Sequence, residues 1–173
     1  SAGNRRGALH TMAELRLATL EDTLKFGELL ARLLPSGETR ALLLRGGLGS
    51  GKTTLTAALV RSLPGGEDAE VSSPSFTLCN IYPTRPQLVH CDLYRCPGHA
   101  PEELVDALED SEKLVVVEWA DYLPADLLPE DFLDISIKME DDGRLLLLRG
   151  AGPHAGTLPA TLVSAMADSG HGD

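Results

Sequence analysis

The sequence predicts an α/β fold with a mostly parallel central sheet that is flanked by helices and closed by a C-terminal β-hairpin. Short apolar runs typical of buried strands alternate along the chain with segments of helical periodicity. Two of these runs, residues 88–91 and 114–117, are each followed by a carboxylate, and a glycine-rich turn follows a third run at residues 40–45. Ligands of such sheets lie at the carboxyl ends of the strands, so these three positions are expected to meet there.

The first half of the chain is expected to form a helix, a strand and a second helix. Thr19, with Asp22 three residues later, resembles a helix start, and leucines at helical spacing extend the pattern to Leu34. Residues 40–45 form a short apolar strand. Residues 54–63 then form a helix that ends at a Pro-Gly-Gly sequence.

The second half of the chain continues this alternation. Residues 71–82 are expected to be a turn that leads into an alternating strand, and residues 88–91 form the next strand. Residues 101–108 are predicted as a short helix with proline in its first turn, and residues 114–117 as the most strand-like run of the chain. Apolar and polar residues alternate over residues 135–139, and an Asp-Asp-Gly turn then leads into an apolar run at residues 144–148, which predicts the closing hairpin.

The chain has 173 residues, and we expect one domain in it, at residues 12–150. We predict a flexible N-terminal extension at residues 1–11 and a flexible C-terminal tail at residues 151–173, because both ends are small or polar and lack periodicity. No apolar run approaches the ~20 residues needed to cross a bilayer. The N-terminus also lacks the apolar core of a secretory signal, so a cytoplasmic protein without membrane contact is expected.

The chain is acidic, with 15 lysine and arginine against 26 aspartate and glutamate residues and a formal net charge of −11. Nonspecific nucleic-acid binding depends on basic side chains that displace counterions. We therefore expect any contact with RNA or DNA to run through a more basic partner.

The three cysteines, Cys79, Cys91 and Cys96, are an odd number in a chain with no sign of export. A disulfide framework is therefore not expected. Together with His99 the cysteines are a formal set of zinc ligands, but their spacings match no standard pair-and-pair pattern. We predict ordinary thiols.

Residues 46–53 read Gly-Gly-Leu-Gly-Ser-Gly-Lys-Thr, a complete GxxxxGK[ST] phosphate-binding loop between a predicted strand and a predicted helix. The glycines let backbone N–H groups surround phosphate oxygens, helped by the positive end of the following helix. Lys52 is expected to reach the β- and γ-phosphates and Thr53 to ligate Mg²⁺. The residues expected to contact a nucleoside triphosphate are Gly47, Leu48, Gly49, Ser50, Gly51, Lys52, Thr53 and Thr54.

A phosphate-binding loop needs a carboxylate for the metal and a group that orients water. Glu118, which follows an apolar strand, is the first candidate to hold Mg²⁺, and Asp92 is the second. One of them polarises the attacking water, and the spacing does not decide which. The hydroxyl-rich segment before the third strand, with Ser73, Ser75 and Thr77, is expected to sense the γ-phosphate as switch segments do.

Four segments occur together in an order that is specific to one family. They are the loop with the Thr-Leu that follows it (residues 46–55), Ser-Pro-Ser-Phe-Thr-Leu (73–78), Asp-Leu-Tyr-Arg (92–95) and Val-Glu-Trp (117–119). In these segments the chain resembles the bacterial TsaE (YjeE) family of small P-loop ATPases. The resemblance spans roughly residues 19–150.

This resemblance implies a P-loop NTPase-like fold and a Mg²⁺-dependent ATPase that is required for threonylcarbamoyladenosine synthesis in tRNA. Members hydrolyse ATP weakly alone and more strongly with the TsaB–TsaD complex, in which TsaD does the carbamoyl transfer. We expect the same partners here, contact with tRNA only through them, and a monomer when alone. Carried onto this chain, Lys52 binds phosphate, while Thr53 and Glu118 serve Mg²⁺. Asp92 is catalytic or linked to the switch, and Arg144 is the late basic residue that touches the nucleotide.

The chain departs from the family pattern at a few positions. Gly47 stands where the family usually has Asp or Asn, Ser50 where it usually has Ala, and Ser75 where it usually has Thr. The segment at residues 103–116 is several residues shorter than in the family and lacks the family's usual glycine and aromatic residues. The changes in the loop leave its glycine spacing and Lys52 in place, so nucleotide binding is still expected.

Two other functions use the same loop. A P-loop kinase phosphorylates a small molecule, but such kinases usually carry an arginine-rich lid, and the late region here holds only Arg144 and Arg149. A nucleotide-dependent binding protein with negligible hydrolysis is the second alternative. An Asn-Lys-x-Asp guanine reader and an ABC-type signature are both absent from the sequence, which disfavours those two classes.

Overall fold

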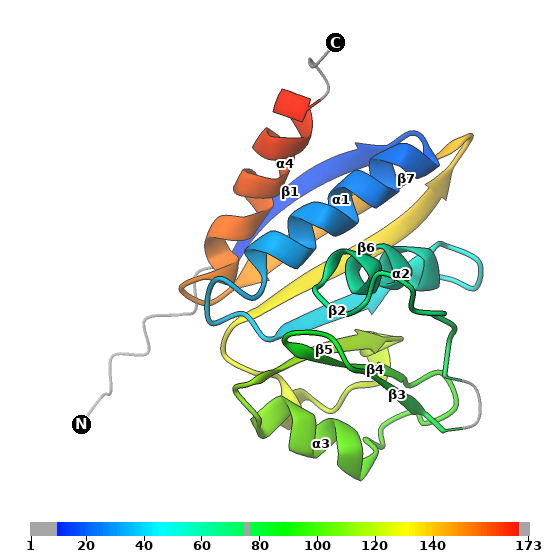
Figure 1. The fold of residues 1–173 in the computed structure, drawn as a ribbon, viewed down its shortest axis with the longest axis vertical. Helices are drawn as coiled ribbons and strands as arrows, with labels where there is room; N and C mark the ends of the chain where they lie inside the picture. The colour runs from blue at the N-terminus through cyan, green and yellow to red at the C-terminus, as the bar shows by residue number, and fades with distance from the viewer. Residues whose placement is uncertain (1–9, 75–76, 170–173) are drawn as a thin grey trace.

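The computed structural model describes residues 10–74 and 77–169. Within these residues seven strands form one sheet, in the order β1-β7-β6-β2-β5-β4-β3 (Figure 1). The strands are β1 (His10–Leu17), β2 (Ala41–Arg45), β3 (Cys79–Tyr82), β4 (Gln87–Asp92), β5 (Lys113–Glu118), β6 (Phe132–Glu140) and β7 (Gly143–Ala151). The α-helices are α1 (Leu20–Leu33), α2 (Lys52–Ser62), α3 (Glu102–Glu109) and α4 (Leu158–Ser169).

The sheet is mixed. Its four central strands, β6, β2, β5 and β4, run parallel, whereas β1, β7 and β3 pair antiparallel with their neighbours. The predicted α/β class and the late hairpin, formed by β6 and β7, are confirmed. The parallel pairing is limited to the centre of the sheet, where the glycine-rich turn and the two strand-end carboxylates are located.

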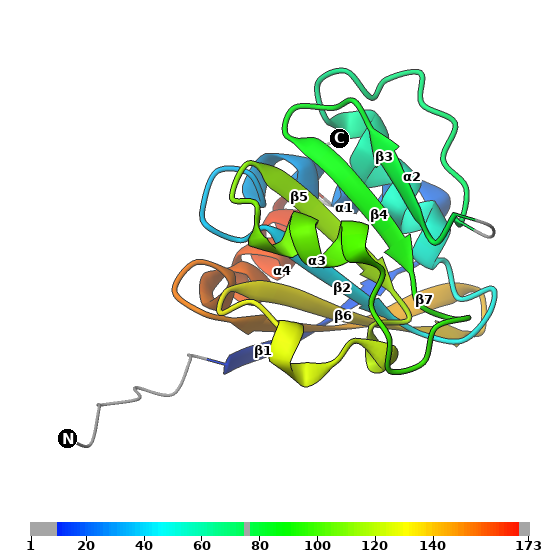
Figure 2. The ribbon, with the colours of Figure 1, turned by 90° about the horizontal axis from the view of Figure 1, so that it is seen from below.

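Helices cover both faces of the sheet (Figures 1 and 2). Successive residues of a strand point to opposite faces of the sheet, so residues of β2 contact the helices on both sides. Leu42 and Leu44 lie in the core layer that contains α1, α2 and α4 residues. Ala41 and Leu43 lie in the layer that contains α3 residues. Because β2 is buried on both faces, its sequence is a continuous apolar run instead of an alternating one.

The helix α1 begins as the sequence predicts. The Thr19 hydroxyl accepts a hydrogen bond from the N–H of Asp22 at 3.2 Å, and the Asp22 carboxylate accepts one from the N–H of Thr19 at 3.2 Å. These two bonds complete a capping box. Further along the helix, Gly27 lies against α2, and a Cβ at this position would overlap the Cβ of Ala58. A residue without a side chain therefore lets α1 and α2 pack closely.

The predicted flexible tail is wrong for residues 158–169, which form α4 and pack on β1 and α1. Leu158 and Leu162 are 2% and 0% exposed and belong to the main core, and Met166 packs against it. These three positions recur every four residues, which is the spacing of an apolar helix face. The small residues between them made the segment look like a tail.

The strand β1 is an element that the sequence analysis did not identify. It begins at His10, within the predicted N-terminal extension, and pairs with β7 along its whole length. Exposed and partly buried residues alternate along it, as expected for a strand at the edge of a sheet. Residues 1–9 of the predicted extension lie outside the described part of the chain.

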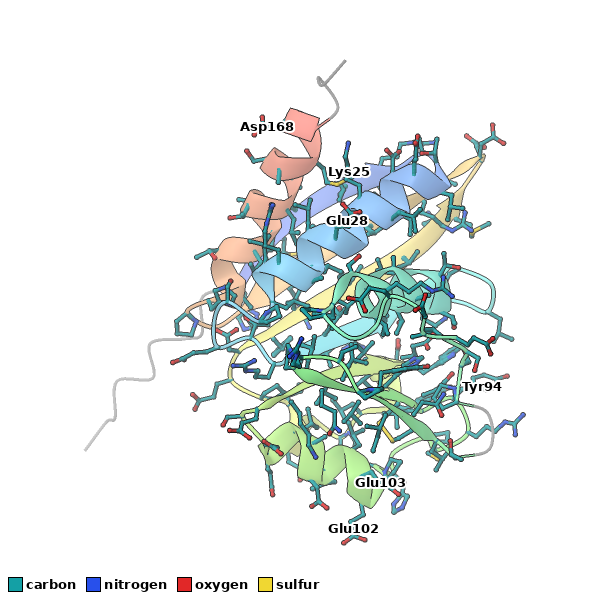
Figure 3. All side chains as sticks on the ribbon, in the orientation of Figure 1. Lys25, Glu28, Tyr94, Glu102, Glu103 and Asp168 are labelled. Atoms are coloured by element: carbon teal, nitrogen blue, oxygen red, sulfur yellow. A yellow bond between two sulfur atoms is a disulfide. The ribbon has the colours of Figure 1, made fainter. Side chains whose placement is uncertain are left out.

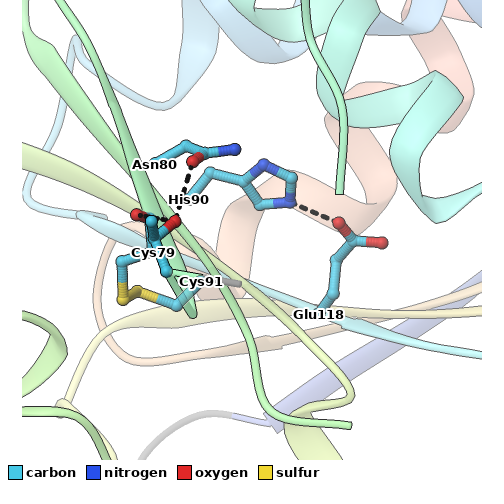
Figure 4. The surroundings of a disulfide bond; sticks show 6 residues. Cys79, Asn80, His90, Cys91 and Glu118 are labelled. Carbon is cyan, nitrogen blue, oxygen red and sulfur yellow. Dashed lines mark hydrogen bonds and ion pairs between the residues drawn. A yellow bond between two sulfur atoms is a disulfide. The ribbon is translucent and has the colours of Figure 1, made fainter. Parts of the chain in front are cut away.

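The prediction of ordinary thiols is wrong for two of the three cysteines. Cys79 on β3 and Cys91 on β4 are directly opposite each other in the antiparallel register and form a disulfide (Figure 4). Cys96 is a free thiol. Their spacing in sequence does not reveal this pairing, because it depends on the register of β3 against β4. Within the described residues, no three histidine, cysteine or carboxylate side chains are arranged to hold a metal.

Several acidic side chains lie on the outside of the fold. Glu28 on α1, Glu102 and Glu103 on α3, and Asp168 on α4 are all exposed (Figure 3). None of the described helices combines the length and the apolar character needed to cross a bilayer.

Replacing Leu162 by alanine tests the packing of α4. Because Leu162 is fully buried, we expect Leu162→Ala to lower the free energy of unfolding by about 2–5 kcal/mol, measured by urea denaturation. Ser164→Ala, at an exposed position on the same helix, is the matched control and should change it by less than about 0.5 kcal/mol. Equal stability of the two variants would mean that residues 158–169 do not pack on the sheet.

Candidate nucleotide-binding site

The glycine-rich turn lies at the carboxyl end of a central parallel strand, since β2 ends at Arg45 and α2 begins at Lys52. Gly49 (φ 74°) and Gly51 (φ 105°) both adopt left-handed backbone conformations, and Gly51 is the N-cap of α2. A side chain would be strained at both positions, which accounts for glycine there. The first N–H groups of α2 have no partner within the helix, so the turn can receive an anion.

Lys52 places a positive charge inside this turn. Its ammonium group donates to the carbonyl oxygens of Gly46 (2.7 Å) and Gly47 (2.8 Å) and lies 4.8 Å from the ring centre of Trp119. Burial lowers the pKa of Lys52, while the carboxylates of Glu118 and Asp92 act in the opposite direction. The group is thus held between backbone oxygens, an aromatic face and two acidic side chains.

Glu118 is the last residue of β5 and is 1% exposed. Its Oε1 accepts a hydrogen bond from the Thr53 hydroxyl at 3.2 Å, and its Oε2 is hydrogen-bonded to Nε2 of His90 (Figure 4). The Thr53 hydroxyl also lies 2.6 Å from the hydroxyl of Ser73. Hydroxyl and carboxylate oxygens are ligands that Mg²⁺ accepts, so Thr53 and Glu118 fit a Mg²⁺ ion at the first turn of α2.

Asp92 is the last residue of β4 and is directly opposite Glu118 in the parallel register. Its Oδ1 accepts a hydrogen bond from the N–H of Tyr94 at 2.9 Å. Burial raises the pKa of Asp92, and the neighbouring Glu118 raises it further, while the bond from Tyr94 lowers it. The strand ends therefore bring a second carboxylate to the site, in a setting that disfavours its ionised form.

Together these groups border a pocket of about 220 Å³. Arg144, on β7, also borders it and donates from Nε to the carbonyl oxygen of Ser50 at 2.8 Å. This bond attaches the late hairpin to the turn. The residues that line the pocket are Leu48, Gly49, Ser50, Gly51, Lys52, Thr53, Thr54, Ser73, Asp92, Glu118, Trp119 and Arg144.

A second cavity of about 150 Å³ adjoins the first, because Ser50, Gly51, Thr54 and Arg144 line both. Its remaining lining is mostly apolar and comes from residues 17–20, Thr23, Leu55, Ile137, residues 142–143 and Leu146. No sequence motif marks these residues as part of the site. They come from both ends of the domain and meet only because β1 pairs with β7.

Most of the predicted site residues lie together. Lys52, Thr53, Asp92, Glu118, Ser73 and Arg144 all border the pocket, whereas Gly47 contributes its carbonyl oxygen to Lys52 without lining it. Thr77 is exposed, and its hydroxyl donates to the carbonyl oxygen of Cys79 and not into the pocket. Ser75 lies outside the described residues. The contributions of His90 and Trp119 were missed, although both are close in sequence to the predicted carboxylates.

A comparison with protein families identifies the chain. The model described as "Threonylcarbamoyl adenosine biosynthesis protein TsaE" matches residues 17–146. The chain belongs to the TsaE family. Helix α4 lies beyond the part of the chain that this TsaE model matches, although it packs on the same core.

Similar proteins of the TsaE family occur in distant bacteria. The chain is 36% identical over 143 residues to the tRNA threonylcarbamoyladenosine biosynthesis protein TsaE of Aquifex aeolicus, covering 82% of this chain and 99% of that protein. It is 34% identical over 141 residues to the protein of that name from Nostoc sp., covering 76% and 82%. The crystal structure of YdiB from Bacillus subtilis superposes with a TM-score of 0.63 at 23% identity, covering 94% and 98% of the two chains. At that identity the likeness establishes the fold alone.

The raised pKa of Asp92 predicts a pH-dependent effect of Asp92→Asn on stability. A folded-state pKa above the usual 3.8 means that the protonated form contributes stability below the unfolded pKa, and that this contribution is lost as the pH rises through the folded pKa. Since asparagine never ionises, we expect Asp92→Asn to be more stable than the wild type at about pH 7, with the difference shrinking towards about pH 4.

Urea denaturation at both pH values measures this difference. Asp126→Asn, at an exposed position, is the control and should show no such gain. If the wild type is instead more stable than Asp92→Asn at neutral pH, the ionised carboxylate is stabilised in the fold. That result would contradict a raised pKa of Asp92.

Proposed function

We propose that this protein is a Mg²⁺-dependent ATPase that is required for threonylcarbamoyladenosine modification of tRNA and acts on a TsaB–TsaD complex. The observation that carries the proposal is the contact of Thr53 with Glu118 beside the buried ammonium group of Lys52. Membership of the TsaE family supports the pathway, because relatives are named tRNA threonylcarbamoyladenosine biosynthesis proteins.

In this proposal the two adjoining cavities hold different parts of ATP. The phosphates bind on the glycine-rich turn beside Lys52, where backbone N–H groups and a cation are available. The nucleoside occupies the more apolar cavity, as expected for the largely uncharged part of the ligand. Arg144 borders both cavities and is placed to contact the nucleotide where they meet.

The chemistry follows from the positions of four side chains. Thr53 and Glu118 would hold Mg²⁺, which when bound would neutralise charge on the phosphate oxygens. Lys52 stabilises the charge on the terminal phosphate. Asp92 orients the attacking water, because both oxygens of Glu118 are already engaged and a raised pKa makes the Asp92 carboxylate a better proton acceptor than an ordinary aspartate.

The acidic character of the chain favours a role through protein partners. With a formal charge of −11, the chain has no basic excess with which to hold tRNA by its phosphates. Contact with tRNA therefore runs through TsaB–TsaD, and ATP hydrolysis is weak until this complex is present. The chain acts as a monomer in the absence of these partners.

Substitution of Lys52 and Glu118 separates binding from hydrolysis. Lys52→Ala removes a charged donor and should weaken ATP binding by about 10–100-fold, measured by calorimetry. Glu118→Gln keeps the shape of the side chain but removes its charge, so it should retain most of the nucleotide affinity measured without Mg²⁺ while phosphate release falls about 100-fold. Lys138→Ala, at an exposed position on β6, is the matched control for charge. Full ATP affinity in Lys52→Ala would contradict the site.

Addition of the partner proteins tests the pathway. We expect purified TsaB and TsaD to increase phosphate release from ATP several-fold and the complete mixture to modify tRNA, detected by mass spectrometry of its nucleosides. Glu118→Gln should support neither reaction. Transfer of the γ-phosphate to a small acceptor would indicate a kinase instead, and ATP binding without phosphate release under any condition would indicate a nucleotide-dependent binding protein.

A further inference from the structure

We propose that His90 is a positioning residue, which holds the Glu118 carboxylate in the orientation needed to bind Mg²⁺ together with Thr53. The inference rests on the proposed function, because it assigns Glu118 to the metal. It concerns a residue that neither the loop motif nor the strand-end carboxylates include.

The first observation is that His90 and Thr53 engage opposite oxygens of one buried carboxylate. Nε2 of His90 is hydrogen-bonded to Oε2 of Glu118 (Figure 4). The Thr53 hydroxyl donates to Oε1 of the same carboxylate. His90 is 0% exposed and Glu118 is 1% exposed. A carboxylate bonded from both sides cannot rotate about its last torsion without losing a bond, so Oε1 is kept on the side of α2.

The second observation is that the imidazole has no other hydrogen bond. Within the described residues, Nδ1 of His90 has no hydrogen-bond partner, although it is buried. The ring lies 6.5 Å from the ring of Tyr82, with an angle of 27° between their planes. If the imidazole only filled the core, both of its nitrogens would be buried without a hydrogen bond, which costs free energy. The bond to Glu118 compensates this cost for Nε2.

The third observation is the place of His90 in the sheet. Leu88, His90 and Asp92 alternate along β4 on one face, and Leu88 lies in the core layer that contains α2 residues. In the parallel register His90 is opposite Val116, two residues before Glu118. An aliphatic residue would suit this layer, and the histidine is instead located where it reaches the strand-end carboxylate diagonally.

Outer hydrogen-bond partners of metal ligands typically change metal affinity or activity by 10–100-fold when they are removed. We therefore expect His90→Leu to weaken the Mg²⁺-dependent part of nucleotide binding by about 10–100-fold. His90→Gln should restore most of it, since the amide nitrogen of glutamine can replace Nε2 as the donor. Val89→Ala is the matched control, because Val89 is buried on the same strand but packs in the opposite layer.

The test is calorimetric titration of ADP into each protein, once with Mg²⁺ and once with a chelator. A loss confined to the Mg²⁺ titration of His90→Leu, with recovery in His90→Gln and none of this pattern in Val89→Ala, supports the proposal. Equal losses with and without Mg²⁺, or an unchanged response to Mg²⁺ in His90→Leu, would overturn it. If the wild type itself binds ADP without any response to Mg²⁺, the proposed function fails as well, so the two failures are distinguishable.

A second measurement does not depend on the folding of the variants. Nitrogen-15 spectra of the wild-type imidazoles report which ring nitrogen of His90 carries the proton. A proton on Nε2 supports the proposal. A neutral ring protonated on Nδ1 cannot donate to Glu118 and would overturn it.

Discussion

A carboxylate that is almost completely buried must find hydrogen-bond donors for its oxygens, and Glu118 has this requirement at the centre of the site. Its donors come from separate parts of the chain, His90 on β4 and Thr53 on α2. The positions of β4, β5 and α2 are therefore coupled through one side chain. A shift of any of these elements would leave a charged group without a partner, which is costly in the protein interior.

The sheet supplies this arrangement through its parallel centre. β2, β5 and β4 are neighbours that run in the same direction, so the turn after β2, Glu118 at the end of β5 and Asp92 at the end of β4 meet at one edge. The antiparallel strands β1 and β7 have a different role. By pairing with β7, β1 brings residues near Leu17 next to the turn, and Arg144 on β7 attaches to it directly.

The sequence was sufficient for those parts of the fold and site that depend on near neighbours in the chain. The glycine spacing of the turn, the capping box at Thr19 and the carboxylates after apolar strands are all local patterns. The disulfide between Cys79 and Cys91 and the bond from His90 to Glu118 depend on strand register, which no single segment encodes. Helix α4 was missed for another reason, because its small residues obscured an apolar spacing of four.

The bonds of Lys52 to Gly46 and Gly47 affect which ions the turn can select. The ammonium group of Lys52 already donates to the carbonyl oxygens of Gly46 and Gly47. An oxygen of an incoming anion must therefore replace these carbonyl oxygens as the hydrogen-bond acceptor. Chloride or another singly charged ion offers little advantage in this exchange, whereas a polyphosphate offers several oxygens and more charge at once. We therefore expect the resting conformation of the lysine to favour a polyanion over common small anions.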